Sequence, residues 1–590
     1  MKLFKKFIII LLVFLSLGTT SSCKFTEGKR DPSTFNEYTY SLVPTLLGED
    51  ELTLHWLFRQ QEDFGFEANY EPSLPTPSNG GSLLGTIVIN AVFGQVKTYD
   101  YSQLDFDQRM TYNILVDLLD SINNKTSEMS YLSNNYLGSY LGYQAQLPLL
   151  FSEYKFYDKI DVETYFKFMD LVPATFKEYV DYEIEKADNG YGMPDFVIDK
   201  VINQCVEFVS DAENHFLIKT FDERLNSLNL TEAERANYIK TNKEKVLGSL
   251  CEGYNYVRDN LPQIKGRATN NLGLAHYEIG KDYYKLLFTD ATGYDMPIED
   301  AIKYVDEKMT LTINKIVSLQ SSKPGISEKV AETSLMTITP EEQMEAFKTL
   351  IGGEFPTIDV YPNINIKYID ESMENHFSPA AYMTSPLDDY ENEFIYLNNA
   401  KIDGDYNYLY TTLAHEGIPG HMYQNIYFKT LENANPIRKI LKSSGYTEGW
   451  ATYAELYSYN FFNSIDEDVL QYLKLYDELN GILTARLDLG IHYEGWTINE
   501  TLNYLQKYFS GYTYEAAQRI FEQLVEVPTN SQQYFFTYFK LVDMHDRAKN
   551  ALGSNFDPIE FHKLILDCGP VPLRFIETEV DNYIANKKGQ

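Results

Sequence analysis

Long amphipathic patterns dominate the chain between Asp105 and Leu350. Apolar residues recur at three-and-four spacing with charged residues between them, as in FDQRMTYNILVDLLDSI and VETYFKFMDLVPATFKEYVDYEIEKA. This period places the apolar side chains on one face of an α-helix. Residues 37–70 are partly of the same kind, and the pattern returns from Asn407 nearly to the end. The sequence therefore predicts a mainly α-helical body.

Residues 355–400 have a different pattern. FPTIDVYPNINIKYIDES alternates and is rich in Ile, Val and Tyr, and EFIYLNN at 393–399 is a second short run of this kind. Both patterns are typical of β-strands. We therefore expect a small β-sheet within the helical body, and EFIYLNN either binds a substrate backbone at its edge or only completes the sheet.

The first residues resemble an export signal. A basic start, MKLFKK, precedes an apolar run from Phe7 to Leu17, and small residues then lead to Cys23. The run is shorter than the roughly 20 residues of a membrane-spanning helix. Because a Cys in this place resembles the cleavage box of bacterial lipoproteins, we expect a signal peptide over 1–22 and a lipid-anchored tether over 23–36. A plain secretory signal is the alternative, and in both cases the protein is exported, to the cell surface or the periplasm.

The mature chain is acidic and poor in cysteine. The formal net charge is −35, and it becomes −38 when the three lysines of the signal peptide are removed. This charge argues against nucleic acid as a partner, which needs a basic footprint, and we interpret it as solubility outside the cell. The remaining cysteines, Cys205, Cys251 and Cys568, are too few for a disulfide scaffold. The oligomeric state stays open.

The segment TTLAHEGIPGHMYQ at 411–424 contains half of the zinc-protease signature HExxH. In that signature two His one turn apart bind zinc, and the Glu activates the bound water. Here Pro419 stands in the place of the second His, and the next His is His421, six residues after His415. On a straight helix these two side chains point about 240° apart. Because Pro419 and Gly420 interrupt the helix, we predict that an expanded turn returns His421 to the face of His415.

A second segment, GYTEGWATYAE, supplies two carboxylates on nearly one helical face. Glu448 and Glu455 are seven residues apart. Zinc sites with two His commonly take a Glu of a later helix as third ligand and leave the fourth position to water. We therefore predict that His415, His421 and Glu448 hold Zn²⁺, and that Glu455 orients a ligating His.

These segments together resemble a bacterial family known as domain of unknown function 885. Its members have a His-Glu-x-x-Pro-Gly-His-His-x-Gln block followed by Thr-Glu-Gly-Trp-Ala-x-Tyr-x-Glu, similar to HEGIPGHMYQ and TEGWATYAE here. RLDLGIHYEGWT (486–497) and VEVPTNSQQYFFTYFKL (525–541) resemble further family segments, and the likeness extends over roughly 270–580. Met422 replaces the second His of the family pair, and Pro-Thr-Asn at 528–530 replaces Pro-Gly-Gln.

The family in turn is similar to helical gluzincin metallopeptidases of the carboxypeptidase Taq and oligopeptidase kind. This resemblance implies a metallopeptidase-like helical body with the sheet beside an active-site cleft, zinc as cofactor and oligopeptides as substrates. Glu416 would act as general base on the zinc-bound water and pass the proton to the leaving amine. Tyr534 and His492 both lie in matched segments, so we predict them as the catalytic residues that could donate to the developing oxyanion.

We expect an N-terminal helical region over 37–350 and a catalytic region over 351–590. Two other functions stay open. A non-catalytic surface lipoprotein could bind peptides or glycans, but it would not need the coincidence of four residues: His415, Glu416, His421 and Glu448. A zinc amidohydrolase acting on a non-peptide amide would use the same site, and the sequence does not separate an endopeptidase from an exopeptidase.

Overall fold

The computed structural model describes residues 30–48, 51–66, 72–77, 89–133, 135–267, 270–369, 371, 374, 377–402 and 404–589. The predicted signal peptide, Cys23 and the first part of the tether lie outside these ranges. Within the described ranges, no helix is both long and apolar enough to cross a membrane. Cys205, Cys251 and Cys568 are separate buried thiols.

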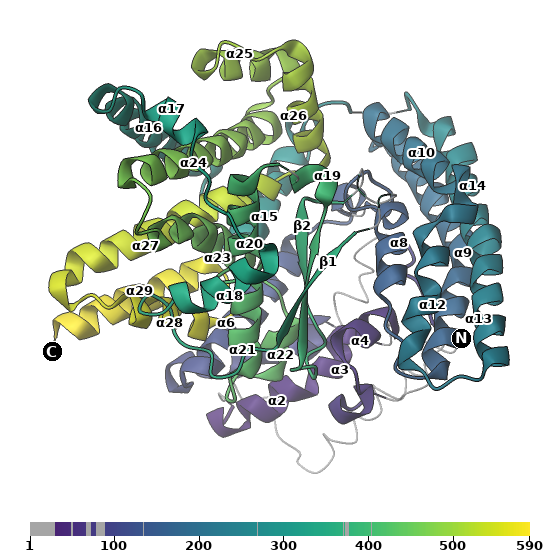
Figure 1. The fold of residues 1–590 in the computed structure, drawn as a ribbon. Helices are drawn as coiled ribbons and strands as arrows, with labels where there is room; N and C mark the ends of the chain where they lie inside the picture. The colour runs from purple at the N-terminus through teal and green to yellow at the C-terminus, as the bar shows by residue number, and fades with distance from the viewer. Residues whose placement is uncertain are drawn as a thin grey trace.

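Helices make up most of the described chain, so the predicted mainly α fold is confirmed (Figure 1). The helices that precede the sheet are α2 (Phe35–Ser41), α3 (Val43–Leu47), α4 (Glu51–Leu57), α6 (Phe106–Asn124), α7 (Ser130–Ser133), α8 (Tyr143–Glu153), α9 (Lys159–Asp188), α10 (Asp195–Ser210), α11 (Phe216–Lys219), α12 (Phe221–Arg224), α13 (Glu232–Lys245), α14 (Cys251–Asn260), α15 (Gly280–Thr292), α16 (Ile298–Ser322), α17 (Ile326–Ala331) and α18 (Pro340–Leu350).

The helices that follow the sheet carry the motifs singled out above. They are α19 (Asn399–Ile402), α20 (Tyr406–Glu416), α21 (His421–Thr430), α22 (Pro436–Ile440), α23 (Ser444–Tyr457), α24 (Glu467–Leu489), α25 (Ile498–Tyr508), α26 (Tyr514–Glu526), α27 (Thr537–Leu552), α28 (Pro558–Cys568) and α29 (Leu573–Lys588). Two π-helical segments, η12 (Gly490–Glu494) and η13 (Gln532–Phe536), continue α24 and precede α27.

Local sequence signals set where the long helices begin. The carboxylate of Asp158 accepts hydrogen bonds from the N–H groups of Ile160 and Asp161 at the start of α9. Thr231 and Thr339 cap α13 and α18, each with a Glu three residues further on. Such capping boxes satisfy N–H groups that the first helical turn leaves without a partner.

Three hydrophobic cores divide the helices. One core joins α8 to α14 into the helical layer on the right of Figure 1. The second joins most helices from α15 onwards with the sheet and part of α6, and the third packs α2 to α4 against α6 and α22. The predicted boundary at residue 350 does not coincide with a boundary between cores, because α15 to α18 share the core of the helices that follow the sheet. The change of core falls between Ile264 and Leu274.

The sheet has the strand order β1–β3–β2. β1 (Asn363–Tyr368) lies within the first predicted strand segment, β3 (Asn392–Leu397) overlaps the second, and the two strands are parallel. β2 (Ala380–Met383), which the pattern did not predict, pairs antiparallel with β3. Because β3 has a neighbour on both sides, EFIYLNN has no free edge, and its predicted alternative of binding a substrate backbone there is wrong. It completes the sheet.

Candidate metal centre

The interrupted His-Glu segment forms two helices instead of one helix with an expanded turn. α20 ends at Glu416, and α21 begins at His421. The turn between them is tight, because a Cβ on Gly420 would lie 1.8 Å from the carbonyl oxygen of His415. A side chain at this position would overlap that carbonyl, so glycine is required there. The predicted expanded turn is therefore wrong, because the helix breaks. The predicted consequence is confirmed: His421, at the start of the new helix, lies beside His415.

Trp450 fixes this turn from a neighbouring helix. Its indole Nε1 donates to the carbonyl oxygen of Pro419 at 2.9 Å, and its ring is fully buried. Gly449 allows α23 to pack closely on α27, since a Cβ there would lie 2.7 Å from Thr537 Oγ1. The segment TEGWATYAE therefore holds the Pro-Gly turn and presents Glu448 from the same helix.

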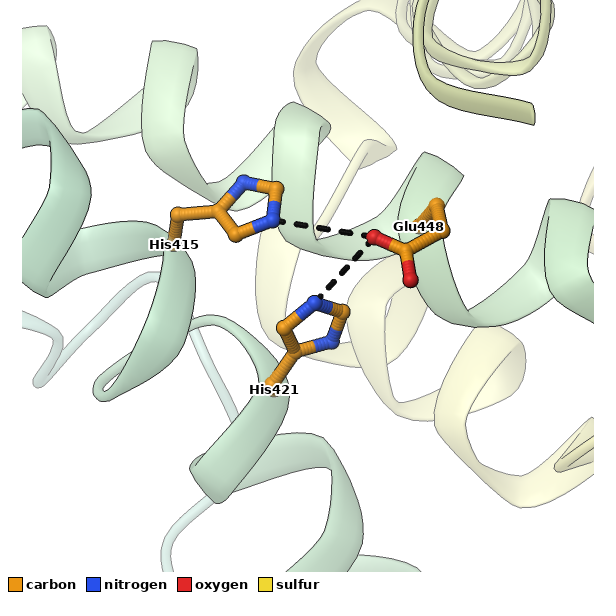
Figure 2. Close-up of side chains that lie close together, drawn as sticks. All are labelled: His415, His421 and Glu448. Carbon is orange, nitrogen blue, oxygen red and sulfur yellow. Dashed lines mark ion pairs between the residues drawn. The ribbon is translucent and has the colours of Figure 1, made fainter. Parts of the chain in front are cut away.

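The three predicted ligands converge on one point (Figure 2). Glu448 Oε2 lies 3.7 Å from His415 Nε2 and 3.2 Å from His421 Nε2, and the three atoms all lie within 4.8 Å of one another. Zinc bonds of about 2.0–2.2 Å at tetrahedral angles place ligand atoms about 3.4 Å apart. Both His side chains are 13% exposed and Glu448 is 22% exposed, so solvent reaches the group. This geometry suits a tetrahedral metal ion with one open position.

Interactions within the group determine its electrostatics. Burial alone raises the pKa of Glu448, but the two imidazoles outweigh it and hold that pKa well below its ordinary value. Burial alone lowers the pKa of His415, but the carboxylates of Glu448 and Glu455 outweigh it and raise that pKa well above its ordinary value. Glu448 Oε2 nevertheless accepts no well-formed hydrogen bond in the described part of the chain. This oxygen faces both imidazoles at 3.7 and 3.2 Å, and a cation held by the three residues would give it a direct ligand bond.

Glu455 lies behind His415, as predicted. Its Oε2 is 2.9 Å from His415 Nδ1, the ring nitrogen that faces away from Glu448. A carboxylate on this nitrogen fixes the tautomer that leaves Nε2 free to bind a metal.

Glu416 follows His415 and contacts the sheet. Its Oε2 accepts a hydrogen bond from the backbone N–H of Tyr382 on β2 at 2.7 Å. Of the two carboxylate oxygens of Glu416, this bond holds Oε2.

Tyr534 also lies at this centre. Its ring is 6.0 Å from the ring of His415, measured between centroids, and the two planes are 23° apart. Burial and the nearby carboxylates of Glu448 and Glu416 raise the pKa of Tyr534. The hydroxyl therefore stays protonated at neutral pH and can act as a hydrogen-bond donor.

A buried network around Asp488 supports the segment that carries Tyr534. Asp488 Oδ2 accepts the N–H of Thr529 at 2.8 Å, and Oδ1 accepts Gln532 Nε2 at 3.2 Å and the hydroxyl of Tyr284. Thr529 has a φ of 65°, the left-handed conformation in which glycine is favoured. Thr529 stands where the family motif has glycine, so this chain holds a branched side chain in a strained backbone conformation.

His492 does not belong to the metal centre, contrary to its predicted catalytic role. It has no exposed surface, its Nδ1 accepts the N–H of Leu274 at 3.1 Å, and its Nε2 lies 2.8 Å from the carbonyl oxygen of Leu524. Both ring nitrogens are therefore occupied by backbone groups. His492 joins η12 to neighbouring segments, and of the two candidate oxyanion donors Tyr534 is the one that lies beside His415.

Two contacts at the centre were not predicted from the sequence. The Trp450 hydrogen bond to the Pro-Gly turn had a signal, because Trp is part of the second motif. The N–H of Tyr382 had none, since a backbone group has no sequence signature and β2 itself was not recognised.

Comparisons with other proteins agree with this fold. A crystal structure described as "the putative lipoprotein from Colwellia psychrerythraea" matches with a TM-score of 0.81 at 16% identity, covering 94% of this chain and 99% of that chain. A "putative lipoprotein of unknown function from Shewanella oneidensis" matches with a TM-score of 0.63 at 15% identity, covering 93% and 99%. These identities establish the fold alone. No curated protein matches the chain in sequence.

A family profile covers most of the chain. It is described as "Bacterial protein of unknown function (DUF885)", and it matches residues 64–580, which include every residue of the metal centre. The predicted family is confirmed: the chain belongs to the DUF885 family.

Proposed function

We propose that this chain is a zinc-dependent hydrolase that cleaves peptide bonds in oligopeptides. The observation that carries the proposal is the convergence of His415, His421 and Glu448, with Glu416 next to the first of them. A protein that only binds peptides or glycans does not need this combination. The resemblance to gluzincin metallopeptidases, which place a Glu beside two His and a Glu ligand, supports the same function.

The residues present suit zinc. Two imidazole nitrogens and one carboxylate oxygen form a donor set typical of catalytic zinc sites. Glu448 Oε2, buried and without a well-formed hydrogen bond, is the atom that a cation would satisfy. Zinc bound there would polarise the scissile carbonyl and lower the pKa of a bound water toward ~7.

The side chains around this set have the roles that amide hydrolysis requires. Glu416 takes a proton from the attacking water while the water oxygen bonds to the carbonyl carbon, and it delivers that proton to the amine as the C–N bond breaks. The hydroxyl of Tyr534 donates to the oxyanion that develops on the carbonyl oxygen. Glu455 keeps His415 in the ligating tautomer.

We further propose that the protein acts outside the cytoplasm, anchored at the cell surface or in the periplasm by lipid on Cys23. The basic start, the short apolar run and the Cys after small residues support this location. Both solved relatives are described as putative lipoproteins, which agrees with it.

The test combines metal content with hydrolysis. The wild-type chain and Glu416→Gln are purified without added chelator, zinc is measured by mass spectrometry, and both are incubated with a broad peptide mixture and a panel of non-peptide amides. We expect one zinc per chain in both proteins, and a rate of peptide cleavage about 100-fold or more lower in Glu416→Gln than in the wild type. Cleavage of the non-peptide amides alone would identify an amidohydrolase. A wild-type protein that holds no metal and cleaves no substrate would contradict the proposal and favour a binding protein.

A further inference from the structure

One face of α21 connects the metal centre to the sheet. His421, Asn425 and Lys429 are four residues apart, so their side chains follow one another along one side of the helix. His421 faces Glu448, whereas Asn425 and Lys429 contact side chains of the sheet and its loop. The helix that begins with a predicted ligand therefore also holds the strands beside that ligand.

Tyr382 is the point on the sheet that α21 contacts. Its hydroxyl accepts a hydrogen bond from Asn425 Nδ2 at 2.7 Å and donates one to Glu393 Oε2 at 2.8 Å. Glu393 is 1% exposed, and its Oε1 lies 3.6 Å from Lys429 Nζ and accepts the hydroxyl of Ser385 at 2.7 Å. In a hydrogen-bond network that is buried from solvent, removing one side chain leaves its partners without hydrogen bonds. The position of Tyr382 is thus set by side chains as well as by strand pairing.

The same tyrosine holds Glu416 through its backbone. The N–H of Tyr382 donates to Glu416 Oε2 at 2.7 Å, so it points away from β3 and toward α20. β2 is four residues long, and within the described residues it pairs with β3 alone. A short edge strand is weakly held by backbone pairing, so the direction of this N–H depends on the anchored Tyr382 side chain.

We propose that Asn425 is a positioning residue for Glu416: by holding the hydroxyl of Tyr382, it fixes the β2 N–H that orients the general base. Asn425 acts through Tyr382 and contacts neither substrate nor the reacting atoms. The inference rests on the proposed function only in the role of Glu416 as base. A misplacement of about 1 Å at a reacting group costs up to about 100-fold in rate, so the effect falls on kcat and leaves zinc binding intact.

The test uses Asn425→Ala, Tyr382→Phe and the double variant in the full mature chain. Tyr382→Phe removes only the hydroxyl and keeps the backbone N–H. The matched control is Tyr427→Phe, which removes a hydrogen bond that α21 makes elsewhere, from the Tyr427 hydroxyl to Asp567 at 2.8 Å. We expect each single variant to lower kcat about 10-fold with KM within about twofold and zinc content unchanged. The double variant should lose no more than either single one, since both break the same connection, and Tyr427→Phe should keep the wild-type kcat.

Hydrogen exchange of the β2 amides gives a second readout that does not need turnover. We expect the Tyr382 amide to exchange at least about tenfold faster in Asn425→Ala and at the wild-type rate in Tyr427→Phe. An unchanged kcat in Asn425→Ala would overturn the inference, as would a parallel loss of zinc, which would mean that Asn425 acts through His421. If the wild type cleaves no substrate, the proposed function fails, and an unchanged exchange rate would still overturn the positioning role by itself.

Discussion

Replacement of Glu455 tests how the ligand set is held. Glu455→Ala removes the carboxylate oxygen that lies 2.9 Å from His415 Nδ1. Loss of such a partner typically weakens metal binding about 10- to 100-fold, which corresponds to about 1.4–2.7 kcal/mol. Glu455→Gln keeps an acceptor oxygen but loses the charge. Because a charge-assisted hydrogen bond is about twice as strong as a neutral one, we expect this variant to lose about half of that free energy, or about 3- to 10-fold in affinity.

The assay is competition for zinc with a chromophoric chelator of known affinity at constant pH. Asp477→Asn is the control, because Asp477 is a neighbouring carboxylate that accepts the hydroxyl of Tyr459 at 2.5 Å, whereas the carboxylate at His415 Nδ1 is that of Glu455. The zinc affinity should fall in the order wild type, Glu455→Gln, Glu455→Ala, with Asp477→Asn equal to wild type. A Glu455→Ala protein that binds zinc within about twofold of wild type would refute the role of this carboxylate in orienting His415.

Three further predictions follow from individual contacts. Tyr534→Phe should lower kcat/KM about 100-fold with unchanged zinc content, because it removes the oxyanion donor; activity within about twofold of wild type would exclude that role. Thr529→Gly should be more stable than Thr529→Val by about 1–2 kcal/mol in denaturant unfolding, because only glycine relieves the φ of 65°; equal stabilities would show that no strain is stored there. Burial lowers the pKa of His562 to about 3 in the folded protein, compared with about 6.5 in the unfolded chain. Because the unfolded state therefore binds the proton first, the free energy of unfolding decreases as the pH falls from about 6.5 toward 3. His562 contributes about 1.4 kcal/mol per pH unit to the slope of unfolding free energy against pH, so this slope should be shallower by that amount in His562→Gln. An identical slope in the wild type and the variant would show that His562 is not held neutral.

The helical fold was predictable because its signals are local. Apolar spacing and capping residues such as Thr231 and Thr339 are visible in the sequence, and they set the helices of the structure. β1 was predictable from its alternating Ile and Tyr, and β3 from its short run of large apolar residues, whereas β2, with the sequence AAYM, has neither signal. The shared core of α15 to α18 with the later helices depends on contacts distant in sequence, whereas the boundary placed at 350 follows the local change from helical to strand-like patterns.

The metal centre was predictable as far as residue type and spacing determine it. His415, His421, Glu448 and Glu455 lie together as the motifs indicated. The backbone conformation that places His421 beside His415 was not predictable, because a helix break and an expanded turn have the same sequence signal, Pro-Gly. His492 was misassigned because membership of a matched segment does not show which side chains are buried.

The most direct test of the central claim is a crystal structure of the zinc-equilibrated protein with anomalous diffraction recorded at the zinc absorption edge. We expect one strong peak within about 2.0–2.2 Å of His415 Nε2, His421 Nε2 and a carboxylate oxygen of Glu448. The absence of a peak there, or a peak held by other residues, would contradict the account.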